Sequence, residues 1–367
     1  MTQDPLIAIS GTNGKTTTAL LLEHILQSPS SPGTGTASPY SIKELGHGSA
    51  GETLSLLIIT NISHPLPKWQ LKENWNQCLR LVRKMKRDSI ILLNADDQFC
   101  LALTDQTEAQ VISYAVHYQQ AMVTAREVAR KPSGMYSFQL VLEEELPSLH
   151  SYPPVKPLSL KLEAPLWGEH NLYNTLAAAT AALLLQKDAR EIKTKIALFP
   201  GVKRQGKLVY HEKLALLDDR ADNPPALQAL MQEVARIPFN KLVMVKGLEP
   251  FTSSAQAQQA ASVLCSWLKK IPLRELIFTP GYRFGQKLAE KETRREDNFL
   301  QYFRESGLTF QFIPEGVDAF YNALETAGEK DLLLLVGNDC LEQVSSMAHN
   351  FIASAGDCCP ANAFNPS

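Results

Sequence analysis

The segment that most constrains the fold joins an apolar run at residues 5–10 to a helical pattern at 19–26 through Gly11-Thr-Asn-Gly-Lys-Thr-Thr-Thr18. A buried strand, a turn with two glycines and a helix start, in this order, are typical of a phosphate-binding loop. Gly11 and Gly14 let backbone N–H groups approach an anion without an intervening Cβ, and the helix start adds further donors. The sequence therefore predicts a phosphate site here.

The side chains of this loop have predicted roles. We expect Lys15 to reach the β- and γ-phosphates of a nucleotide, and the hydroxyl of Thr16 to bind Mg²⁺. The other loop residues expected to contact the nucleotide are Gly11, Thr12, Asn13, Gly14 and Thr17. Ile9 stands where the strict pattern has its first glycine, so the loop is a variant of that pattern. An ordinary glycine-containing turn before a helix is the alternative interpretation.

Composition narrows the class of protein. The chain has 367 residues, enough for about two domains, and its apolar content of 44% can form a sizeable core. A net charge of −2 gives no argument for a nucleic-acid partner, and no apolar run approaches the ~20 residues of a membrane span. The six cysteines form no Cys-x-x-Cys pair. We therefore expect a cytoplasmic protein without a signal peptide.

Hydrophobic patterns divide the chain into two series of strands and helices. In the first series we expect strands at 54–60, 89–94 and 111–116, an amphipathic helix at 69–87, an antiparallel appendage within 136–162, and an alanine-rich helix that begins near 167–179. In the second we expect strands at 214–217, 242–246, 276–279, 310–313 and 332–336. Strands that alternate with helices predict parallel sheets covered on both faces.

Turn-forming residues mark the boundaries between these parts. Residues 28–39 are rich in Ser, Pro and Gly and are expected to be a mobile loop near the nucleotide. Pro200 and Gly201 interrupt the pattern between the two series. We therefore predict a first domain at 1–199, a second at 200–352 and a flexible tail at 353–367.

Short motifs in a fixed order carry a family resemblance. They are Gly11-Thr-Asn-Gly-Lys-Thr-Thr17, Thr60-Asn-Ile-Ser63, Leu93-Asn-Ala-Asp-Asp97, Gly168-Glu-His-Asn-Leu-Tyr-Asn174 and Asp219-Arg-Ala-Asp-Asn-Pro224. Together they resemble the Mur ligase superfamily, which includes the peptidoglycan Mur synthetases, folylpolyglutamate synthase and the MurT-type subunit of lipid II amidation. The resemblance implies an α/β fold, in which a P-loop ATPase-type parallel-sheet domain is followed by a Rossmann-like domain.

The resemblance also implies a reaction. A substrate carboxylate attacks the γ-phosphate of ATP, an amine then attacks the resulting acyl-phosphate, and ADP and phosphate leave. ATP and Mg²⁺ are the implied cofactors, and the class is an ADP-forming ligase that joins a carboxylate to an amine. The implied substrate is a small molecule or a cell-wall precursor.

Three further residues gain implied roles in nucleotide binding and catalysis. Because phosphoryl transfer to a carboxylate brings anions together, a second cation is needed beside Lys15, and the resemblance assigns it to Arg204. Lys203 is equally well placed, and both side chains suit a solvated basic linker as well. Asp219 ends a buried strand and is expected to face the nucleotide. A helix cap at Asp222 or Asn223 explains part of that motif without function.

Two amides and two metal ligands complete the implied site. Asn171 and Asn174 lie one helical turn apart, where family members bind the adenine edge; capping or solvent-facing amides are the alternative. Glu44 is the nearest match to the family's metal-binding glutamate, and a plain surface glutamate is the alternative. His64 is retained in Ser63-His-Pro-Leu-Pro67, where relatives have Asp-His-Leu-Asp. We expect it to assist the metal and catalysis, or else to be an exposed loop histidine.

The departures from the family keep other functions open. Arg220 and Asp222 replace the family's tyrosine and histidine, and the loss of both acids around His64 weakens the case for a second Mg²⁺ site. A nucleotide-binding scaffold or regulatory subunit with the same fold is therefore the alternative to a ligase. A P-loop kinase or GTPase is disfavoured, because no guanine-reading Asn-Lys-x-Asp segment occurs.

The position of the loop at the start of the chain suggests which relatives are nearest. The Mur synthetases carry an N-terminal domain for a uridine nucleotide, which we expect this chain to lack. MurT-type proteins share the loop sequence, and they leave open a glutaminase-type partner subunit. Their cysteine zinc ribbon has no counterpart here, because no suitable cysteine spacing occurs.

Overall fold

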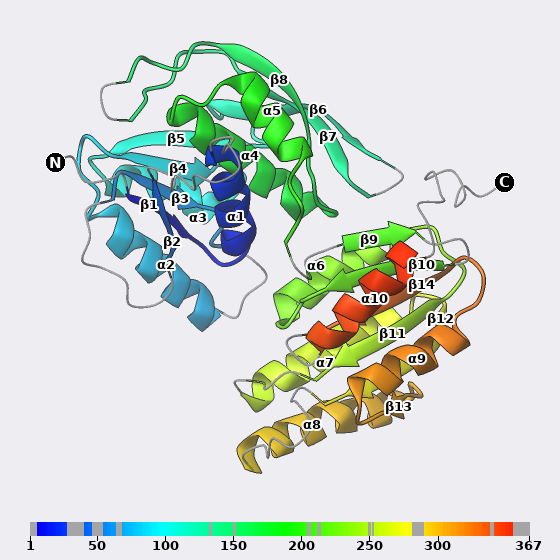
Figure 1. The fold of residues 1–367 in the computed structure, drawn as a ribbon. Helices are drawn as coiled ribbons and strands as arrows, with labels where there is room; N and C mark the ends of the chain where they lie inside the picture. Colours follow the sequence, from blue (N-terminus) through cyan, green and yellow to red (C-terminus); the bar gives the residue numbers. More distant parts are fainter. Residues whose placement is uncertain are drawn as a thin grey trace. The chain divides into compact units, whose positions relative to one another are not determined.

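The computed structural model shows a chain that folds as two compact units, and each unit is an α/β structure around its own sheet (Figure 1). The first unit consists of Met1–Lys131 and Met135–Val202, and the second contains Lys203–Ser367. The structure describes residues 6–27, 40–45, 54–63, 68–131, 134–149, 152–202, 204, 207–210, 214–248, 251, 253–280, 290–337 and 341–354. The predicted α/β class with largely parallel sheets is confirmed. The predicted mobile loop at 28–39 lies outside the described residues, as does most of the predicted tail.

The first unit contains an eight-stranded sheet with the order β2-β1-β3-β4-β5-β6-β7-β8. Its strands are β1 (Leu6–Ser10), β2 (Ser41–Glu44), β3 (Leu56–Ile59), β4 (Ile90–Asn94), β5 (Gln110–Ala115), β6 (Val123–Arg130), β7 (Tyr136–Leu142) and β8 (Leu158–Glu163). The neighbours from β2 to β6 pair in parallel, whereas β7 and β8 pair antiparallel. Each apolar run that predicted a strand in this unit therefore forms one.

One prediction for this sheet was wrong. Residues 136–162 were expected to form an antiparallel appendage, and β7 and β8 do pair antiparallel, but they continue the main sheet. The link is β6, which the sequence analysis missed. It pairs in parallel with β5 at Tyr114 and Val123 and antiparallel with β7. Only the first three of the eight residues of β6 are buried, so it lacks the continuous apolar run of its neighbours.

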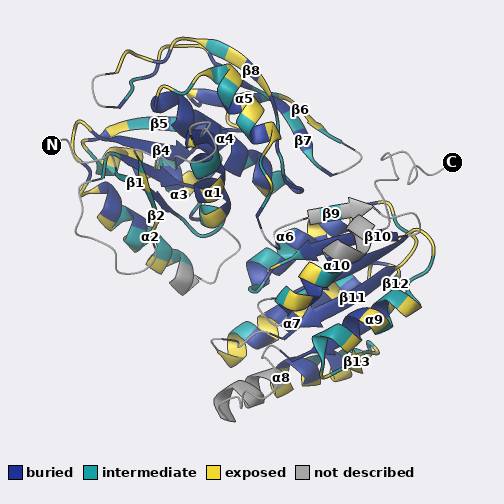
Figure 2. Ribbon diagram, in the orientation of Figure 1, coloured by how far each residue is buried: buried dark blue, intermediate teal, exposed yellow. Residues whose placement is uncertain are grey.

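Helices cover both faces of this sheet. They are α1 (Lys15–Leu26), α2 (Lys68–Val82), α3 (Gln98–Leu101), the 3₁₀-helix η1 (Thr104–Gln106), α4 (Glu169–Leu184) and α5 (Ala189–Ala197). Successive strand residues point to opposite faces, so Ile7 and Ile9 pack with α1, α4 and α5 while Ala8 packs with α2. Figure 2 shows the resulting buried strands between partly exposed helices. Burial on both faces explains why the central strands read as uninterrupted apolar runs.

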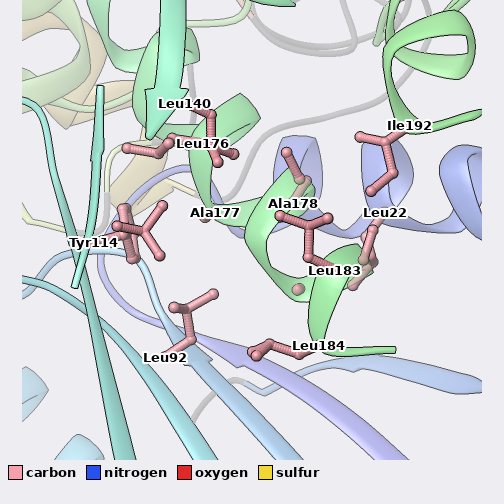
Figure 3. Packing of buried hydrophobic residues seen from close by; sticks show 14 of the residues in the cluster. Leu22, Leu92, Tyr114, Leu140, Leu176, Ala177, Ala178, Leu183, Leu184 and Ile192 are labelled. Carbon is pink, nitrogen blue, oxygen red and sulfur yellow. The ribbon is translucent and has the colours of Figure 1, made fainter. Parts of the chain in front are cut away.

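Helix α4 lies at the centre of the larger core cluster. Its alanines, including Ala177 and Ala178, are fully buried, as expected for the alanine-rich helix predicted there. Figure 3 shows Leu22 of α1, Ile192 of α5 and Leu92 of β4 around these small side chains. Small residues let α1 and the sheet approach α4 closely, and this close packing fixes the start of α4 beside the start of α1.

The second unit contains a six-stranded sheet with the order β13-β12-β11-β14-β10-β9. Its elements are β9 (Lys207–Tyr210), β10 (Leu214–Asp219), α6 (Pro224–Val234), β11 (Leu242–Gly247), α7 (Ser254–Leu268), β12 (Leu273–Thr279), α8 (Glu290–Ser306), β13 (Gln311–Phe312), α9 (Gly316–Thr326), β14 (Asp331–Val336) and α10 (Glu342–Ser354). All five predicted strands are present and parallel. The sequence analysis missed β9, an antiparallel edge strand that pairs with β10. No helix among the described residues of either unit is long and apolar enough to cross a membrane.

A partly buried histidine is expected to make the stability of the first unit sensitive to acid. The ring of His24, in the last turn of α1, contacts Phe199 at a centroid distance of 5.5 Å. Burial lowers the pKa of His24, the nearby charge of Lys195 lowers it further, and a hydrogen bond with the Lys195 backbone offsets part of this shift. The folded state therefore takes up the proton less readily than the unfolded state. The neutral ring of His24 therefore contributes to the free energy of unfolding above the ordinary pKa of 6.5. This contribution is lost as the pH falls below 6.5 toward the lowered pKa of the folded state.

We predict that His24→Leu will flatten the acid side of the stability profile. The free energy of unfolding, measured by urea denaturation between about pH 8 and about pH 5, should fall less steeply in the variant than in the wild type. Leu20→Gln, which changes an exposed side chain of the same helix and no titratable group, is the matched control and should leave the slope unchanged. Equal slopes for His24→Leu and the wild type would contradict the prediction.

Candidate nucleotide site

The predicted motifs of the first unit meet at one edge of its sheet. The segments that follow β1, β3, β4 and β5 contain Gly11–Gly14, Thr60–Ser63, Ala95–Asp97 and Val116–Tyr118. Because these strands are parallel, their carboxyl ends share an edge, which is where ligands bind in sheets of this kind. Hydrogen bonds join these segments directly, so motifs that are far apart in the sequence form one structure.

Gly11 is required where the loop leaves β1. Its φ of +131° is in a region that favours glycine, and a Cβ on it would lie 2.3 Å from Thr60 Oγ1 and 2.8 Å from the carbonyl oxygen of Asn61. Thr60 Oγ1 also donates to the carbonyl oxygen of Asn13 at 2.6 Å. The loop therefore rests directly on the end of β3, and a larger residue at position 11 would push the two segments apart.

Asn61 fixes the middle of the loop. Its side chain accepts from the backbone N–H of Asn13 and donates to the carbonyl oxygen of Asn13, both at 3.1 Å. The backbone N–H of Thr12 donates to the carbonyl oxygen of Asn61 at 2.9 Å. The Thr12 hydroxyl donates to Ile62 O at 3.2 Å and accepts from Asn74 of α2 at 2.9 Å. These bonds hold Thr12 and Asn13 against the segment that follows β3 and against α2. The contacts of Thr12 and Asn13 with a nucleotide remain predictions.

Lys15 folds back over the loop. Its Nζ donates to the carbonyl oxygens of Gly11 at 2.8 Å and Thr12 at 3.1 Å. Burial lowers the pKa of Lys15, while the nearby Glu44 and Cys78 partly offset this by raising it. The ammonium group thus lies at the mouth of a cradle of backbone atoms. No side chain caps the start of α1 at Gly14, and no acidic residue lies in its first turn.

Thr16 and Glu44, both predicted as metal ligands, lie side by side. The Thr16 hydroxyl donates to Glu44 Oε2 at 2.9 Å. Glu44 reaches this position because β2 pairs in parallel with β1, with Glu44 opposite Ile9. A hydroxyl and a carboxylate are oxygen ligands of the kind that Mg²⁺ takes, together with phosphates and water. The third predicted ligand, His64, lies outside the described residues. Among the residues that are described, no cluster of three or more His, Cys, Asp or Glu side chains suits a metal.

Asp97 connects the motif after β4 to the motif after β3. It is 5% exposed, and its Oδ2 accepts from the backbone N–H groups of Ile62 at 2.6 Å and Ser63 at 2.7 Å. Its Oδ1 accepts from Phe99 N at 2.9 Å and Cys100 N at 3.3 Å, which caps α3. One carboxylate therefore holds the segment on which the phosphate loop rests.

The neighbouring Asp96 connects β4 to α4. Its carboxylate accepts from the backbone N–H groups of Val116, His117 and Tyr118 and from the Tyr173 hydroxyl, the last at 2.9 Å. Burial alone raises the pKa of Asp96, but these hydrogen bonds outweigh it and lower the pKa below its ordinary value. The carboxylate therefore stays ionised and anchors the first turns of α4 to the sheet edge.

Asn171 and Asn174, predicted to bind adenine, make their hydrogen bonds within the protein. Asn171 Nδ2 donates to the carbonyl oxygen of Trp167 at 2.7 Å, and Asn174 Nδ2 donates to Asn171 Oδ1 at 3.0 Å. Asn174 Oδ1 accepts from the Thr18 hydroxyl at 3.4 Å. Both amides are buried, as is the side chain of Thr17 in the loop. Their contact with adenine remains a prediction, and in the structure they hold α4 against α1.

The predicted residues of the second unit are held by bonds within that unit. Arg204, which is 4% exposed and has a φ of +57°, donates through Nε to the fully buried Asp218 at 3.2 Å. Asp219 Oδ1 accepts from the backbone N–H of Ala221 at 2.8 Å. Asn223 caps α6, as the alternative interpretation of this motif allowed. Lys203 lies outside the described residues. The nucleotide roles of Arg204 and Asp219 remain predictions.

The chain is similar in sequence to known proteins of one family. Residues 70–182 match the Mur ligase middle domain family. The chain is related to the Mur ligases. It is 24% identical to the UDP-N-acetylmuramate–L-alanine ligase of Caldicellulosiruptor saccharolyticus, over 92% of this chain and 76% of that one. It is 23% identical to the enzyme of the same name from Clostridium acetobutylicum, over 68% of this chain and 55% of that one. The chain thus spans about half the length of the second relative, and the phosphate loop lies outside the family match.

Solved Mur ligases share the fold. MurF from Acinetobacter baumannii superposes with a TM-score of 0.68 at 18% identity, covering 96% of this chain and 77% of that one. MurF from Thermotoga maritima, solved in complex with ADP, superposes with a TM-score of 0.63 at 13% identity. The match covers 96% of this chain and 80% of that one. These relatives and solved structures are Mur synthetases by name. They give no support to the expected closeness to MurT-type proteins or to a glutaminase-type partner.

The sequence analysis missed several residues of the candidate site. It quoted the motifs that contain Asn61 and Asp97 but assigned neither residue a role, and it did not mention Asn74. A polar residue within three positions of the end of a buried strand is a usable signal for Asn61 and Asp97. Asn74 lies on the amphipathic helix α2, where nothing in the sequence separates it from a solvated polar residue.

Proposed function

We propose that this protein is an ATP-dependent, ADP-forming ligase that joins a carboxylate to an amine in a cell-wall precursor. The observation that carries the proposal is the joint position of Lys15, Thr16 and Glu44 at the mouth of a backbone cradle. The relatives are UDP-N-acetylmuramate–L-alanine ligases by name, which supports this reaction class for the chain. The ADP complex of a structural neighbour supports nucleotide binding on this fold.

The residues present fit a magnesium–nucleotide complex. Glycine at positions 11 and 14 lets the loop pack closely on its neighbours, because a Cβ at either position would lie 2.3 Å from a neighbouring side chain. Thr16 and Glu44 would hold Mg²⁺ between them. When bound, Mg²⁺ would neutralise charge that develops on the phosphate oxygens.

The protein groups have separate tasks in the proposed reaction. Lys15 would exchange its two bonds to loop carbonyls for bonds to the β- and γ-phosphates, where its positive charge stabilises the transferring group. The substrate carboxylate would form a bond to the γ-phosphorus as the bond to ADP breaks. The amine would then attack the carbonyl carbon of the acyl-phosphate, phosphate would leave, and the ammonium proton would pass to solvent. Arg204 and His64 are the further residues that we propose for catalysis.

A nucleotide-binding scaffold is the second candidate function. It is favoured by the sequence after Ile62, where Ser63 and Leu66 replace the two acids of the family motif. Such a protein would bind Mg-ATP in the same cradle but would not couple its hydrolysis to an acceptor and an amine. Turnover therefore separates the two functions, whereas nucleotide binding does not.

We predict that Glu44→Gln will raise the Mg²⁺ concentration needed for half-maximal ATP binding by about tenfold or more, because the carboxylate ligand is lost. ADP release, measured with UDP-N-acetylmuramate and L-alanine, should require both substrates in the wild type and fall in the variant. The substrates are taken from the names of the relatives. Glu23→Gln on α1 is the matched control and should behave as wild type.

Two results would contradict this proposal. An unchanged Mg²⁺ requirement in Glu44→Gln would remove Glu44 from the metal site. Wild-type protein that binds Mg-ATP but releases no ADP with this pair or with other precursor and amino-acid pairs would favour the scaffold.

A further inference from the structure

One face of helix α2 contacts the segments that carry the candidate nucleotide site. Asn74, Gln77 and Cys78 are three or four residues apart in this helix, so their side chains point the same way. Cys78 is 1% exposed, and its Sγ lies 3.9 Å from Ser10 Oγ, at the end of β1. Asn74 and Gln77 are half-buried, whereas the neighbouring Glu73 is exposed. The polar residues of this amphipathic helix therefore divide between solvent and the site.

Asn74 ties the phosphate loop to α2. Its Nδ2 donates to Thr12 Oγ1 at 2.9 Å, while the Thr12 hydroxyl donates its single proton to the carbonyl oxygen of Ile62 at 3.2 Å. The hydroxyl is therefore held from two directions. The carbonyl oxygen of the same Thr12 accepts from Lys15 Nζ at 3.1 Å. A shift of Thr12 would thus move the part of the loop on which the ammonium group rests.

Gln77 holds the end of the strand that carries Glu44. Its Nε2 donates to the carbonyl oxygen of Leu45, the residue after Glu44, at 3.4 Å. The backbone N–H of Leu45 donates to the carbonyl oxygen of Ile9 at 2.9 Å. Among the described strands β2 pairs only with β1, because it lies at the edge of the sheet. The bond from Gln77 therefore adds a restraint where strand pairing acts from one side, close to the carboxylate that meets Thr16.

We propose that two amides of α2 position the two parts of the nucleotide site. Asn74 positions the phosphate loop through Thr12, and Gln77 positions Glu44 through the backbone of Leu45. This inference rests on the proposed nucleotide site and deepens it. Both residues act through another residue, so their effect is on the geometry of the groups that meet phosphate and Mg²⁺.

The two residues should affect different ligands. The loop offers its N–H groups and Lys15 to phosphate with or without a metal. Glu44 contributes as a ligand only when Mg²⁺ bridges it to the phosphates. Inorganic tripolyphosphate, measured with Mg²⁺ and again in EDTA without it, separates the two contributions. A general loosening of the first unit would instead lower both affinities in both variants.

Titration calorimetry on the full-length chain measures both affinities. For Asn74→Ala we expect the affinity for tripolyphosphate to fall by about three- to tenfold, by the same factor with and without Mg²⁺. For Gln77→Ala we expect about a threefold fall with Mg²⁺ and an unchanged affinity without it. Asn76→Ala, which changes an exposed asparagine of the same helix, is the matched control and should leave both affinities at the wild-type value.

The melting temperature without ligand controls for the fold. Because Asn74 and Gln77 are half-buried polar residues outside the apolar core, both alanine variants should melt within about 2 °C of the wild type. A variant that keeps its melting temperature and loses affinity has lost the geometry of the site and not the stability of the first unit.

Double variants test the residues through which the amides act. Thr12→Val removes the hydroxyl that Asn74 bonds, so Asn74→Ala in that background should lower the affinity for tripolyphosphate little further. Glu44→Gln removes the metal ligand, so Gln77→Ala in that background should have little further effect on the affinity with Mg²⁺.

Each outcome has a definite meaning. Wild-type affinity in Asn74→Ala or in Gln77→Ala would overturn the proposal for that residue. Equal losses with and without Mg²⁺ in Gln77→Ala would overturn its link to Glu44, and fully additive losses in a double variant would overturn the link that the variant tests. In all these cases a wild type that binds tripolyphosphate leaves the proposed function standing. Wild-type protein that binds neither tripolyphosphate nor ATP would refute the proposed function, and the inference with it.

Discussion

Replacing Lys15 with methionine is expected to lower the affinity for Mg-ATP by about a hundredfold or more. The variant keeps the apolar stem and loses the only charge that the loop itself brings to the phosphates. Truncating one partner of a close, partly buried charge pair costs about 2–5 kcal/mol, and about 2.7 kcal/mol corresponds to a hundredfold. The fold should persist, because Lys15 bonds only carbonyl oxygens of its own loop among the contacts described.

Thermal shift with Mg-ATP is a direct measurement of this effect. In the wild type, a nucleotide concentration a hundredfold above the dissociation constant should stabilise the folded state by about 2.7 kcal/mol. In Lys15→Met that stabilisation should almost disappear, while the melting temperature without nucleotide stays close to the wild-type value. Lys86→Ala, which removes an exposed lysine elsewhere in the first unit, is the control and should respond as wild type does. Full nucleotide stabilisation in Lys15→Met would exclude this loop from the site.

Replacing Asp97 with alanine is expected to destabilise the first unit by about 3 kcal/mol. The change removes the acceptor of four backbone N–H groups at a position that is 5% exposed. Hydrogen bonds to a charged group contribute about 1.5–3 kcal/mol each, and the total is limited because water and local shifts replace some of them. For a unit of this size the melting temperature should fall by roughly 6–12 °C.

Calorimetry measures this loss, and nucleotide titration tests its functional consequence. Because Asp97 holds Ile62 and Ser63, and Ile62 accepts from Thr12, the variant should also bind Mg-ATP more weakly. Asp105→Ala, at an exposed position of η1, is the control for loss of a negative charge and should melt within about 2 °C of the wild type. An equally small change in Asp97→Ala would show that the carboxylate does not hold these segments.

Local sequence determined the elements of the fold to a large extent. The strand before Gly11, the helix after Gly14 and the five parallel strands of the second unit were predicted from residues that lie next to one another in the chain. Buried central strands need apolar residues on both faces, so they leave a signal that does not depend on their neighbours. The loop pattern predicted that Gly11 lets backbone N–H groups approach an anion, whereas its close contact with Thr60 and Asn61 is known only from the structure.

Elements with one exposed side left no such signal. The exposed edge strand β2 and the half-buried β6 were both missed. Their place is decided by pairing with strands that were formed elsewhere in the chain. As a result, the prediction placed β7 and β8 outside the main sheet, when β6 joins them to it.

The candidate site also combines features that local sequence predicts with features that only the tertiary structure decides. The sequence by itself predicted a loop with Lys15 and Thr16 that leads into the first helix, because a short run of residues defines it, and its role in phosphate binding remains a prediction. Only the tertiary structure placed Glu44 against Thr16, Asp97 beneath Ile62 and Asn174 against Gly14. Each of these contacts joins segments far apart in the chain. The first two depend on the parallel register that brings the carboxyl ends of the strands to one edge, and the third depends on the packing of α4 against α1. Register is a property of the whole sheet, set by the burial of all its strands at once, so no single motif contains it.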